Sequence, residues 1–374
     1  MWGKSQIKRI ARQLSLLCLS VCLWACQPSM QPSAQPDYNW SLPEGFPAPL
    51  VPSDNPMTQA KVSLGERLFF DNGLSFNNSM SCASCHQPEF AFAEPRQFAL
   101  GASGEALRRN TQGLMNVAYH SELTWAHSAL NSIEQQLLIP MFAEDPIELG
   151  ITGYEDLVLK RFQQAPYKTM FTEAFGDSEI SFLRIVQALA SYVRSLISFN
   201  SAFDRYAYFA DDNALAADAL RGMELFFSER LECFHCHGGL NFTQASQHQN
   251  QRLVLRAFHN TGLYNTDGQG TYPDQDQGLI EVTLLPDDMG HFRAPSLRNV
   301  AITAPYMHDG SIATLSQVID FYAAGGRGEG ATNPLKSPFV KGFNLSDSEK
   351  SDLLAFLHSL TDKQFLAAPN KPQD

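Results

Sequence analysis

Two five-residue segments of the chain combine thiols and an imidazole at a fixed spacing. Both read C-x-x-C-H, and their residues are Cys82, Cys85 and His86 in the first and Cys233, Cys236 and His237 in the second. Thiols three positions apart lie on nearly the same side of a helical turn, and the histidine follows directly. Two thioether bonds and an iron–imidazole bond are the attachment chemistry of c-type haem. The motifs therefore predict two covalent haems, with His86 and His237 as iron ligands.

Two other uses of paired cysteines fit the sequence less well. A single tetrahedral zinc site made of all four thiols would leave the histidine after each pair without a role. A redox-active dithiol of the thioredoxin type needs a βαβ context, and the hydrophobic pattern does not indicate one. The other three of the seven cysteines lie at or before residue 26, so no structural disulfide is predicted.

The elements that must position these motifs show an internal repeat. Residues 65–70 and 222–227 both read G-x-x-L-F-F, and each phrase precedes one haem motif. We interpret the repeat as two copies of one unit, in which a helix presents Leu and Phe to the edge of the haem. The predicted fold class is mostly α, with two tandem cytochrome c-like domains, each around one covalent haem, and long loops.

Further helices are predicted from local patterns. Apolar residues recur with a period near 3.6 over residues 180–198, and residues 314–324 form a helix that ends at Gly325. Ser346 and Glu349 have the spacing of a capping box, which opens a helix with Leu353, Leu354, Leu357 and Leu360 on its core face. Residues 243–289 are rich in Gly, Asp, Gln and Asn, which favours long loops with a short hairpin.

The first 25 residues have the pattern of a secretory signal peptide, a basic start followed by a short apolar run. The run ends in L-W-A-C, which resembles a bacterial lipobox, so lipidation of Cys26 is predicted; plain cleavage and an uncleaved anchor are the alternatives. We predict a tether over 26–55, a first cytochrome c-like domain over 56–205, a second cytochrome c-like domain over 206–365 and a tail over 366–374. The protein is then periplasmic and meets the membrane only through its N-terminal lipid.

The charge balance of the chain bears on its partners. The formal net charge is −12, and loss of a leader with four basic and no acidic residues leaves −16. Such acidity argues against a nucleic-acid partner, because phosphates require basic patches. It suits a basic docking partner, but acidity is also a plain source of solubility.

Motifs outside the haem segments resemble the bacterial di-haem cytochrome c peroxidases and MauG. They follow in order: R-N-T at 109–111, Trp125, E-Q-Q at 134–136, P-S-L-R-N-V at 295–300 and T-A-P-Y-M-H-D-G at 303–310. The resemblance extends from Pro56 to Thr361. Phrases such as L-T-W-A at 123–126 and H-N-T-G-L-Y-N at 259–265 look most like the MauG-type branch known as MbnH, from metallo-mystery pair operons.

The resemblance implies that the first haem is the peroxide site. Gln136, Pro140 and Glu148 match the family's distal residues, among which a carboxylate moves a proton between the peroxide oxygens. The stretch from Pro140 to Glu148 is two residues longer than the family pattern, so Glu144 is the alternative acid. Without the resemblance, Glu148 would be interpreted as a solvated loop residue.

The resemblance also assigns residues near the second haem. Trp125 is implied as a bridge between the haems, although a core position is the commoner fate of a lone tryptophan. The far-side iron ligand is Met in classical peroxidases and Tyr in MauG-like enzymes. The matching position, 14 residues after His308, is Tyr322, and Met289 and Met307 are competing ligands. A phenolate stabilises ferric and higher oxidation states. Tyr322 therefore indicates a haem that shares a high oxidation state and does not have to be reduced before the protein reacts with peroxide.

A calcium ion lies between the domains in the family. The matching ligands are the side chain of Asn110 and the backbone oxygens of Thr303 and Pro305, and oxygen donors suit a hard cation. His308 lies in the same region, where it is expected to hold water or a haem propionate.

Three functions are compatible with these residues. In a MauG-like enzyme, hydrogen peroxide oxidises the first haem, both haems share a high-valent state, and a partner protein is oxidised at long range. In the MbnH-like branch, the target is a tryptophan of a copper-binding periplasmic partner, converted to kynurenine. The alternatives are a classical peroxidase that reduces peroxide to water with electrons from a small cytochrome, and a non-catalytic electron-transfer di-haem cytochrome.

Overall fold

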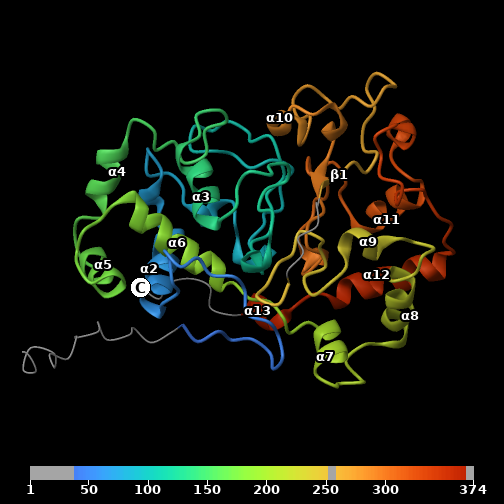
Figure 1. Ribbon diagram of the computed structural model, residues 1–374, viewed down its shortest axis with the longest axis horizontal. Coiled ribbons are helices and arrows are strands. Elements are labelled where there is room, and N and C mark those ends of the chain that lie inside the picture. The colour runs from blue at the N-terminus through green and yellow to red at the C-terminus, as the bar shows by residue number, and fades with distance from the viewer. Residues whose placement is uncertain (1–37, 252–257, 368–374) are drawn as a thin grey trace, which may run out of the picture. The chain divides into compact units, whose positions relative to one another are not determined.

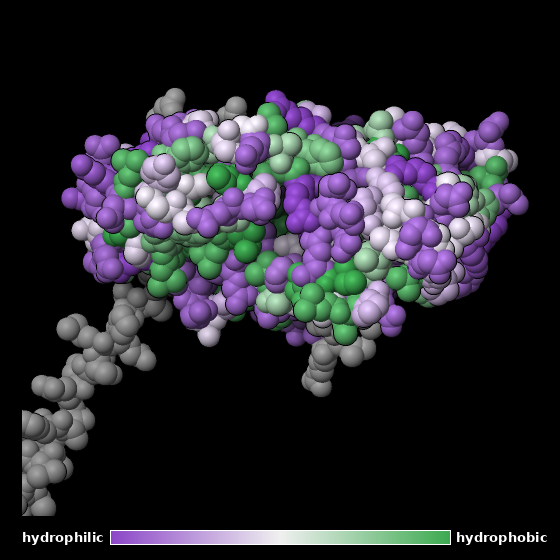
Figure 2. Space-filling view, turned by 90° about the horizontal axis from the view of Figure 1, so that it is seen from above, coloured by the Kyte–Doolittle hydropathy of each residue, from purple (hydrophilic) through white to green (hydrophobic). Residues whose placement is uncertain are grey.

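The computed structural model describes residues 38–251 and 258–367, and this part of the chain is mostly helical with little sheet (Figure 1). The predicted signal peptide, Cys26, the first part of the predicted tether and residues 368–374 lie outside the described residues. None of the described helices has the length and apolar character needed to cross a membrane. Hydrophobic residues gather in patches between hydrophilic ones on the face shown in Figure 2.

The first haem motif lies among five α-helices. They are α2 (Gln59–Phe69), α3 (Ile133–Phe142), α4 (Glu155–Arg161), α5 (Tyr167–Phe175) and α6 (Phe182–Ser195). Single 3-10 turns occur at Asn72–Leu74, Cys82–Ser84, Pro88–Phe90 and Val117–Tyr119. The helix predicted over 180–198 is α6, and the hydroxyl of Ser181 caps it by accepting the N–H of Arg184.

The second haem motif forms a short helix of its own. The helices here are α7 (Ala202–Tyr208), α8 (Ala217–Phe226), α9 (Cys233–His237), α10 (Ile280–Thr283), α11 (Leu315–Ala323), α12 (Asp347–Ser359) and α13 (Lys363–Ala367). Further 3-10 turns lie at Pro286–Asp288, Val300–Ile302 and Gly328–Thr332. The predicted capping box is confirmed at α12, where Ser346 and Glu349 bond reciprocally.

The repeated G-x-x-L-F-F phrase builds the same helix crossing twice, α2 on α6 and α8 on α12 (Figure 1). A Cβ placed on Gly65 would lie 2.0 Å from the carbonyl oxygen of Ala188 in α6. A Cβ on Gly222 would lie 1.9 Å from the carbonyl oxygen of Asp352 in α12. Only glycine permits such close approach of two backbones. The repeat in the sequence is therefore a repeat in the packing.

Buried apolar side chains form two main clusters, one drawn from residues 57–196 and one from residues 203–360. This agrees with two tandem units, while the exact domain boundaries stay a prediction. A third cluster joins Trp125 to residues between 258 and 321. Helix α13 also returns to the first unit, since the ring of Phe365 lies 5.9 Å from that of Phe92.

Residues 38–55, predicted as part of a tether, pack against the folded chain instead. Trp40 contacts the first cluster, and the ring of Phe46 lies 4.9 Å from that of Phe199. Asn55 is buried and donates to the carboxylate of Glu134 at 2.7 Å. Burial of these aromatic rings favours packing despite the proline-rich composition.

The loop-rich region 243–289 is largely irregular as predicted, but the described residues form no hairpin within it. Strand β1 (Phe258–His259) pairs instead with β2 (Phe292–Arg293), beyond the end of that region, in antiparallel register. The pairing brings Arg293 to a buried position, which is important for the site below.

Candidate active site: two cavities that meet at Trp125

Each C-x-x-C-H motif lines its own cavity. The first cavity, of about 400 Å³, is lined by Cys82, Cys85 and His86, and the second, of about 180 Å³, by Cys233, Cys236 and His237. Phe69 of α2 and Phe226 of α8 line the first and the second cavity, as expected for helices that face a haem edge. Because the two thiol pairs lie in separate cavities, they do not form one tetrahedral zinc site.

Burial makes the four motif thiols weak acids. Burial raises the pKa of Cys82, Cys85 and Cys233 to about 12 and that of Cys236 to about 11. Thiol nucleophiles and metal-binding cysteines need a thiolate, which a raised pKa disfavours. The environment suits sulfur held in a thioether and not a redox dithiol.

Both motif histidines are held in the same way. Nδ1 of His86 lies 2.8 Å from the carbonyl oxygen of Phe92, and Nδ1 of His237 lies 3.0 Å from the carbonyl oxygen of Pro295. Because a carbonyl only accepts hydrogen bonds, Nδ1 carries the proton and Nε2 keeps its lone pair. Burial lowers the pKa of both rings, to about 4 for His237. A neutral ring oriented in this way suits an iron ligand, so these residues fit a c-type haem.

The predicted distal residues all line the first cavity. Gln136 and Pro140 come from α3, whose first turn is capped by Ser132, and Glu148 lies in the loop that follows. The N–H of Leu149 donates to the carbonyl oxygen of Pro140 at 2.9 Å, which folds this loop back onto α3. The longer spacing therefore does not remove Glu148 from the cavity. Glu144, the alternative, is not among the residues that line it.

Two polar groups in this cavity are poised for proton chemistry. Burial raises the pKa of Glu148 to about 7, so the carboxyl changes protonation state near neutral pH. The side-chain oxygen of Gln136 is buried and has no hydrogen-bond partner among the described residues. An acid–base group and an unpaired acceptor beside an open cavity suit the binding of a small polar molecule.

Trp125 lies between the two cavities and lines both. It is buried, with its indole Nε1 donating to the carbonyl oxygen of Asn110 at 2.8 Å. Its own carbonyl accepts the backbone N–H of Arg293 at 2.7 Å. Trp125 is thus both a core aromatic and, with Arg293, one of two residues that line both cavities.

The second cavity is also lined by Tyr322, from α11, and by Met307. Met289, another ligand candidate, does not line this cavity. Burial raises the pKa of the Tyr322 phenol, so a nearby cation would be needed to hold it as a phenolate. His308 also lines this cavity, and its ring stacks on Phe292 at 3.6 Å.

The calcium ligands expected from the resemblance lie in segments that meet. The backbone N–H of Asn110 donates to the carbonyl oxygen of His308 at 2.7 Å, close in sequence to Thr303 and Pro305. The side-chain nitrogen Nδ2 of Asn110 donates to the backbone carbonyls of Arg96 and Gln97. A calcium ion at Asn110, Thr303 and Pro305 stays a prediction.

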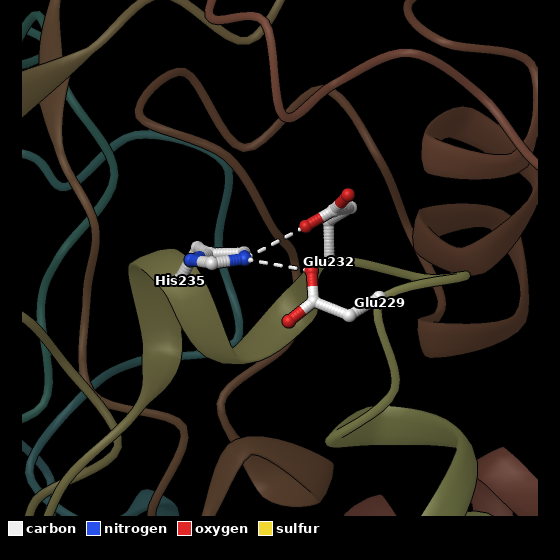
Figure 3. A group of neighbouring side chains, drawn as sticks. All are labelled: Glu229, Glu232 and His235. Atoms are coloured by element: carbon white, nitrogen blue, oxygen red, sulfur yellow. Dashed lines mark hydrogen bonds and ion pairs between the residues drawn. The ribbon is translucent and has the colours of Figure 1, made fainter.

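One group of metal-type ligands in the described residues lies outside both cavities. It consists of Glu229, Glu232 and His235, shown in Figure 3. His235 Nε2 lies 2.8 Å from Glu232, and Lys341 already pairs with that carboxylate at 2.5 Å. The imidazole also stacks on Phe339 at 4.3 Å. These contacts account for the group as an ion-pair cluster.

Sequence reasoning missed Arg293, His120 and Thr124 in the site. All three line the first cavity, and Arg293 lines the second as well. His120 is buried, and burial lowers its pKa well below the usual value. Thr124 lies within the L-T-W-A phrase at 123–126, which could have drawn attention to it, whereas Arg293 and His120 lie in none of the motifs identified in the sequence.

Comparison with known proteins agrees with this geometry. Residues 59–213 match the family model described as di-haem cytochrome c peroxidase. The chain is 36% identical over 322 residues to methylamine utilization protein MauG of Methylophilus methylotrophus, covering 85% of this chain and 86% of that protein. It is also 36% identical over 328 residues to cytochrome-c peroxidase IdrP1 of Denitromonas iodatirespirans, covering 83% of this chain and 84% of that protein.

Solved structures extend the comparison to the fold. The crystal structure of a MauG-like protein associated with microbial copper homeostasis superposes with a TM-score of 0.87 at 44% identity, over 90% of this chain and 99% of that one. The di-haem peroxidase BthA from Burkholderia thailandensis shares the fold, with a TM-score of 0.65 at 22% identity over 86% of this chain and 91% of that one. The chain therefore belongs to the di-haem cytochrome c peroxidase and MauG family, and it is a peroxidase-type oxidoreductase with two c-type haems.

Proposed function

We propose that this protein uses hydrogen peroxide at the first cavity to oxidise a partner protein that binds at its surface. The observation that carries the proposal is the contrast between the polar residues that line the two cavities. The first holds Glu148 and Gln136, and the second holds Tyr322. In this proposal one haem is attached through Cys82 and Cys85 and the other through Cys233 and Cys236.

The first cavity would activate peroxide with its own side chains. Haem supplies an iron centre that accepts peroxide and removes electrons from other groups. Glu148 takes a proton from one peroxide oxygen and returns it to the other, which then leaves as water. Its pKa of about 7 suits both transfers near neutral pH. Gln136 accepts a hydrogen bond from the incoming molecule, and Pro140 keeps the wall of the cavity apolar.

Trp125 would carry electrons between the two haem sites. Its indole lines both cavities, and a hydrogen bond from Nε1 to Asn110 fixes its orientation. A fixed ring at the boundary shortens each electron-transfer step. Electrons from the partner protein then reach the first site, while peroxide receives them and becomes water.

The identity of the far ligand in the second cavity decides between two versions of this function. A Tyr322 phenolate stabilises ferric iron, so the fully oxidised protein would react with peroxide directly, as in the MauG-like hypothesis. Met307 lines the same cavity and favours the second candidate, a classical peroxidase that needs prior reduction and draws electrons from a small cytochrome. A non-catalytic cytochrome would not require Glu148 and Gln136 beside an open cavity.

The proposal also specifies the partner and the location. Similarity to a MauG-like protein associated with microbial copper homeostasis supports a copper-binding partner. We propose that this partner is periplasmic and that its target residue is a tryptophan, which is converted to kynurenine. We place this protein in the periplasm, anchored through a lipid on Cys26. A calcium ion held by Asn110, Thr303 and Pro305 would stabilise the junction near Trp125.

Stopped-flow absorption with one equivalent of peroxide and the fully oxidised protein tests the proposal. We expect a fast Soret change and a new near-infrared band without any reductant. Tyr322→Met should abolish the near-infrared band, whereas Met307→Leu should retain it. If the wild-type protein reacts only after one haem has been reduced, the classical peroxidase is correct and Tyr322 is not the ligand.

A further inference from the structure

Unpaired buried polar atoms concentrate in residues 120–124 and at Arg293. Within the described residues they include both ring nitrogens of His120, the hydroxyls of Ser121 and Thr124, one oxygen of Glu122 and Nη1 of Arg293. An unpaired buried polar group is costly, so a cluster of them indicates a missing polar partner. The positions of these unpaired atoms limit the chemical class of the missing partner.

Arg293 has a fixed orientation within this cluster. Its side chain is 3% exposed, Nε donates to the carbonyl oxygen of Thr124 at 3.0 Å, and Nη2 donates to the side-chain oxygen of Gln112. Its backbone is held by the pairing of β2 with β1 and by the hydrogen bond to Trp125. Only Nη1 remains without a partner, so the guanidinium has one free edge and a buried positive charge.

Arg293 forms no ion pair with a carboxylate in the described residues. Burial lowers its pKa to about 10, and the charge of Glu122 offsets only part of this effect, without an ion pair between the two side chains. A buried cation is normally paired with an anion or well hydrogen-bonded. The missing partner is therefore most simply an anion with oxygen acceptors.

The lining of the cavities locates this anion. His120, Thr124 and Arg293 line the first cavity together, and of these three only Arg293 also lines the second. The anion belongs to whatever occupies the first cavity, at its edge nearest Trp125. A haem carries two carboxylates on one edge of its ring.

We propose that Arg293 binds a carboxylate of the haem in the first cavity, with His120 and Thr124 as further polar contacts. Arg293 is then a positioning residue, because it links this carboxylate to the carbonyl of Thr124 and the backbone of Trp125. The proposal rests on the proposed loading of the first cavity with haem. It adds a residue that sets both the orientation and the potential of that haem.

The charge of Arg293 gives the proposal a measurable consequence. A cation beside a haem stabilises the reduced form, which carries one more electron, and so raises the midpoint potential. Loss of the cation should lower the potential of the first haem more than that of the second. A purely structural arginine would affect stability without this selective shift.

Redox titration of the loaded protein tests this, with the spectra of the two haems followed separately. We expect R293Q to lower the midpoint potential of the first haem and R293K, which keeps the charge, to stay closer to wild type. R108Q is the matched control, because Arg108 lines the same cavity but its side chain is 45% exposed and already pairs with Glu281. It should shift the potential less than R293Q.

A crystal structure of the wild-type loaded protein is the second measurement, and it applies even if R293Q does not fold. A carboxylate oxygen within hydrogen-bonding distance of Nη1 is expected. Unchanged potentials in R293Q with both haems attached, or a Glu122 carboxylate on Nη1 in that structure, would overturn the inference. Mass spectrometry of the wild-type protein separates the two proposals: absence of the haems would refute the proposed function itself.

Discussion

The two haem sites are alike around their C-x-x-C-H motifs and differ in the other polar residues that line their cavities. A glycine-dependent helix crossing precedes each motif, and a backbone carbonyl orients each histidine. The first cavity also has Glu148 and Gln136, and the second has Tyr322 and Met307. The repeated part of the fold therefore supplies cofactor attachment. The difference in chemistry comes from α3 with its following loop, and from α11.

The largest expected effect concerns the acid that only the first cavity has. Glu148→Gln should slow the reaction with peroxide by about 10²–10⁴-fold, because the amide cannot take the proton. The measurement is the stopped-flow rate at saturating peroxide. Glu144→Gln is the control and should react at the wild-type rate, since Glu144 does not line the cavity. Equal losses of rate in the two variants would mean that Glu148 is not the acid–base group of the first cavity.

The two helix crossings that precede the motifs are tested by replacing the glycine at each one. Gly65→Ala and Gly222→Ala should each destabilise the protein by about 1–3 kcal/mol, because the new Cβ forces two helices apart. Chemical denaturation of each variant measures the change in the free energy of unfolding. If one substitution has no effect, the two helix crossings are not equivalent.

The pH dependence sharpens the comparison further. Because the pKa of Glu148 is about 7, the fraction of its carboxylate falls below that pH, and the rate should fall about tenfold per pH unit there. A pH series of the peroxide reaction measures this. The same raised pKa means that the contribution of Glu148 to stability is present below its unfolded value and is lost as the pH rises through about 7. Glu148→Gln should therefore melt higher than wild type at pH 8, and identical melting would contradict the assigned burial of this carboxyl.

The smallest effect is expected at a residue excluded from the second cavity. Met289→Leu conserves volume and should cost less than about 1.5 kcal/mol. It should leave the visible spectrum of the second haem unchanged, because Met289 does not line that cavity. A changed spectrum would show that the far wall of the second cavity includes more than Tyr322 and Met307.

Local signals in the sequence predicted the local parts of the fold. The capping box at Ser346 and the helices at α6 and α11 follow from spacing within one element, so they could be found without tertiary information. The resemblance to the family, based on motifs that occur in order, predicted Gln136, Pro140 and Glu148, which line the first cavity. The resemblance was also needed to select Glu148 from the loop acids.

Tertiary relationships were the part that could not be predicted. Arg293 donates to Gln112, which is 181 residues earlier, and nothing in either local sequence indicates that contact. The role of Gly65 and Gly222 depends on a partner helix more than a hundred residues away. Trp40 packs although its neighbours are typical of a linker, because burial of an aromatic ring outweighs local composition.

The return of α13 to the first unit has a consequence for the order of folding. Phe92, which is fully buried, is covered in part by Phe365, and the carboxylate of Asp362 accepts hydrogen bonds from Ser198 and Asn200. The first unit is synthesised before the second, yet Asp362 and Phe365, which pack against it, follow the second unit in the sequence. The first unit completes its packing only after the second unit has been synthesised. Removal of α13 should therefore disturb the surroundings of the first haem, although α13 follows the second haem motif in the sequence.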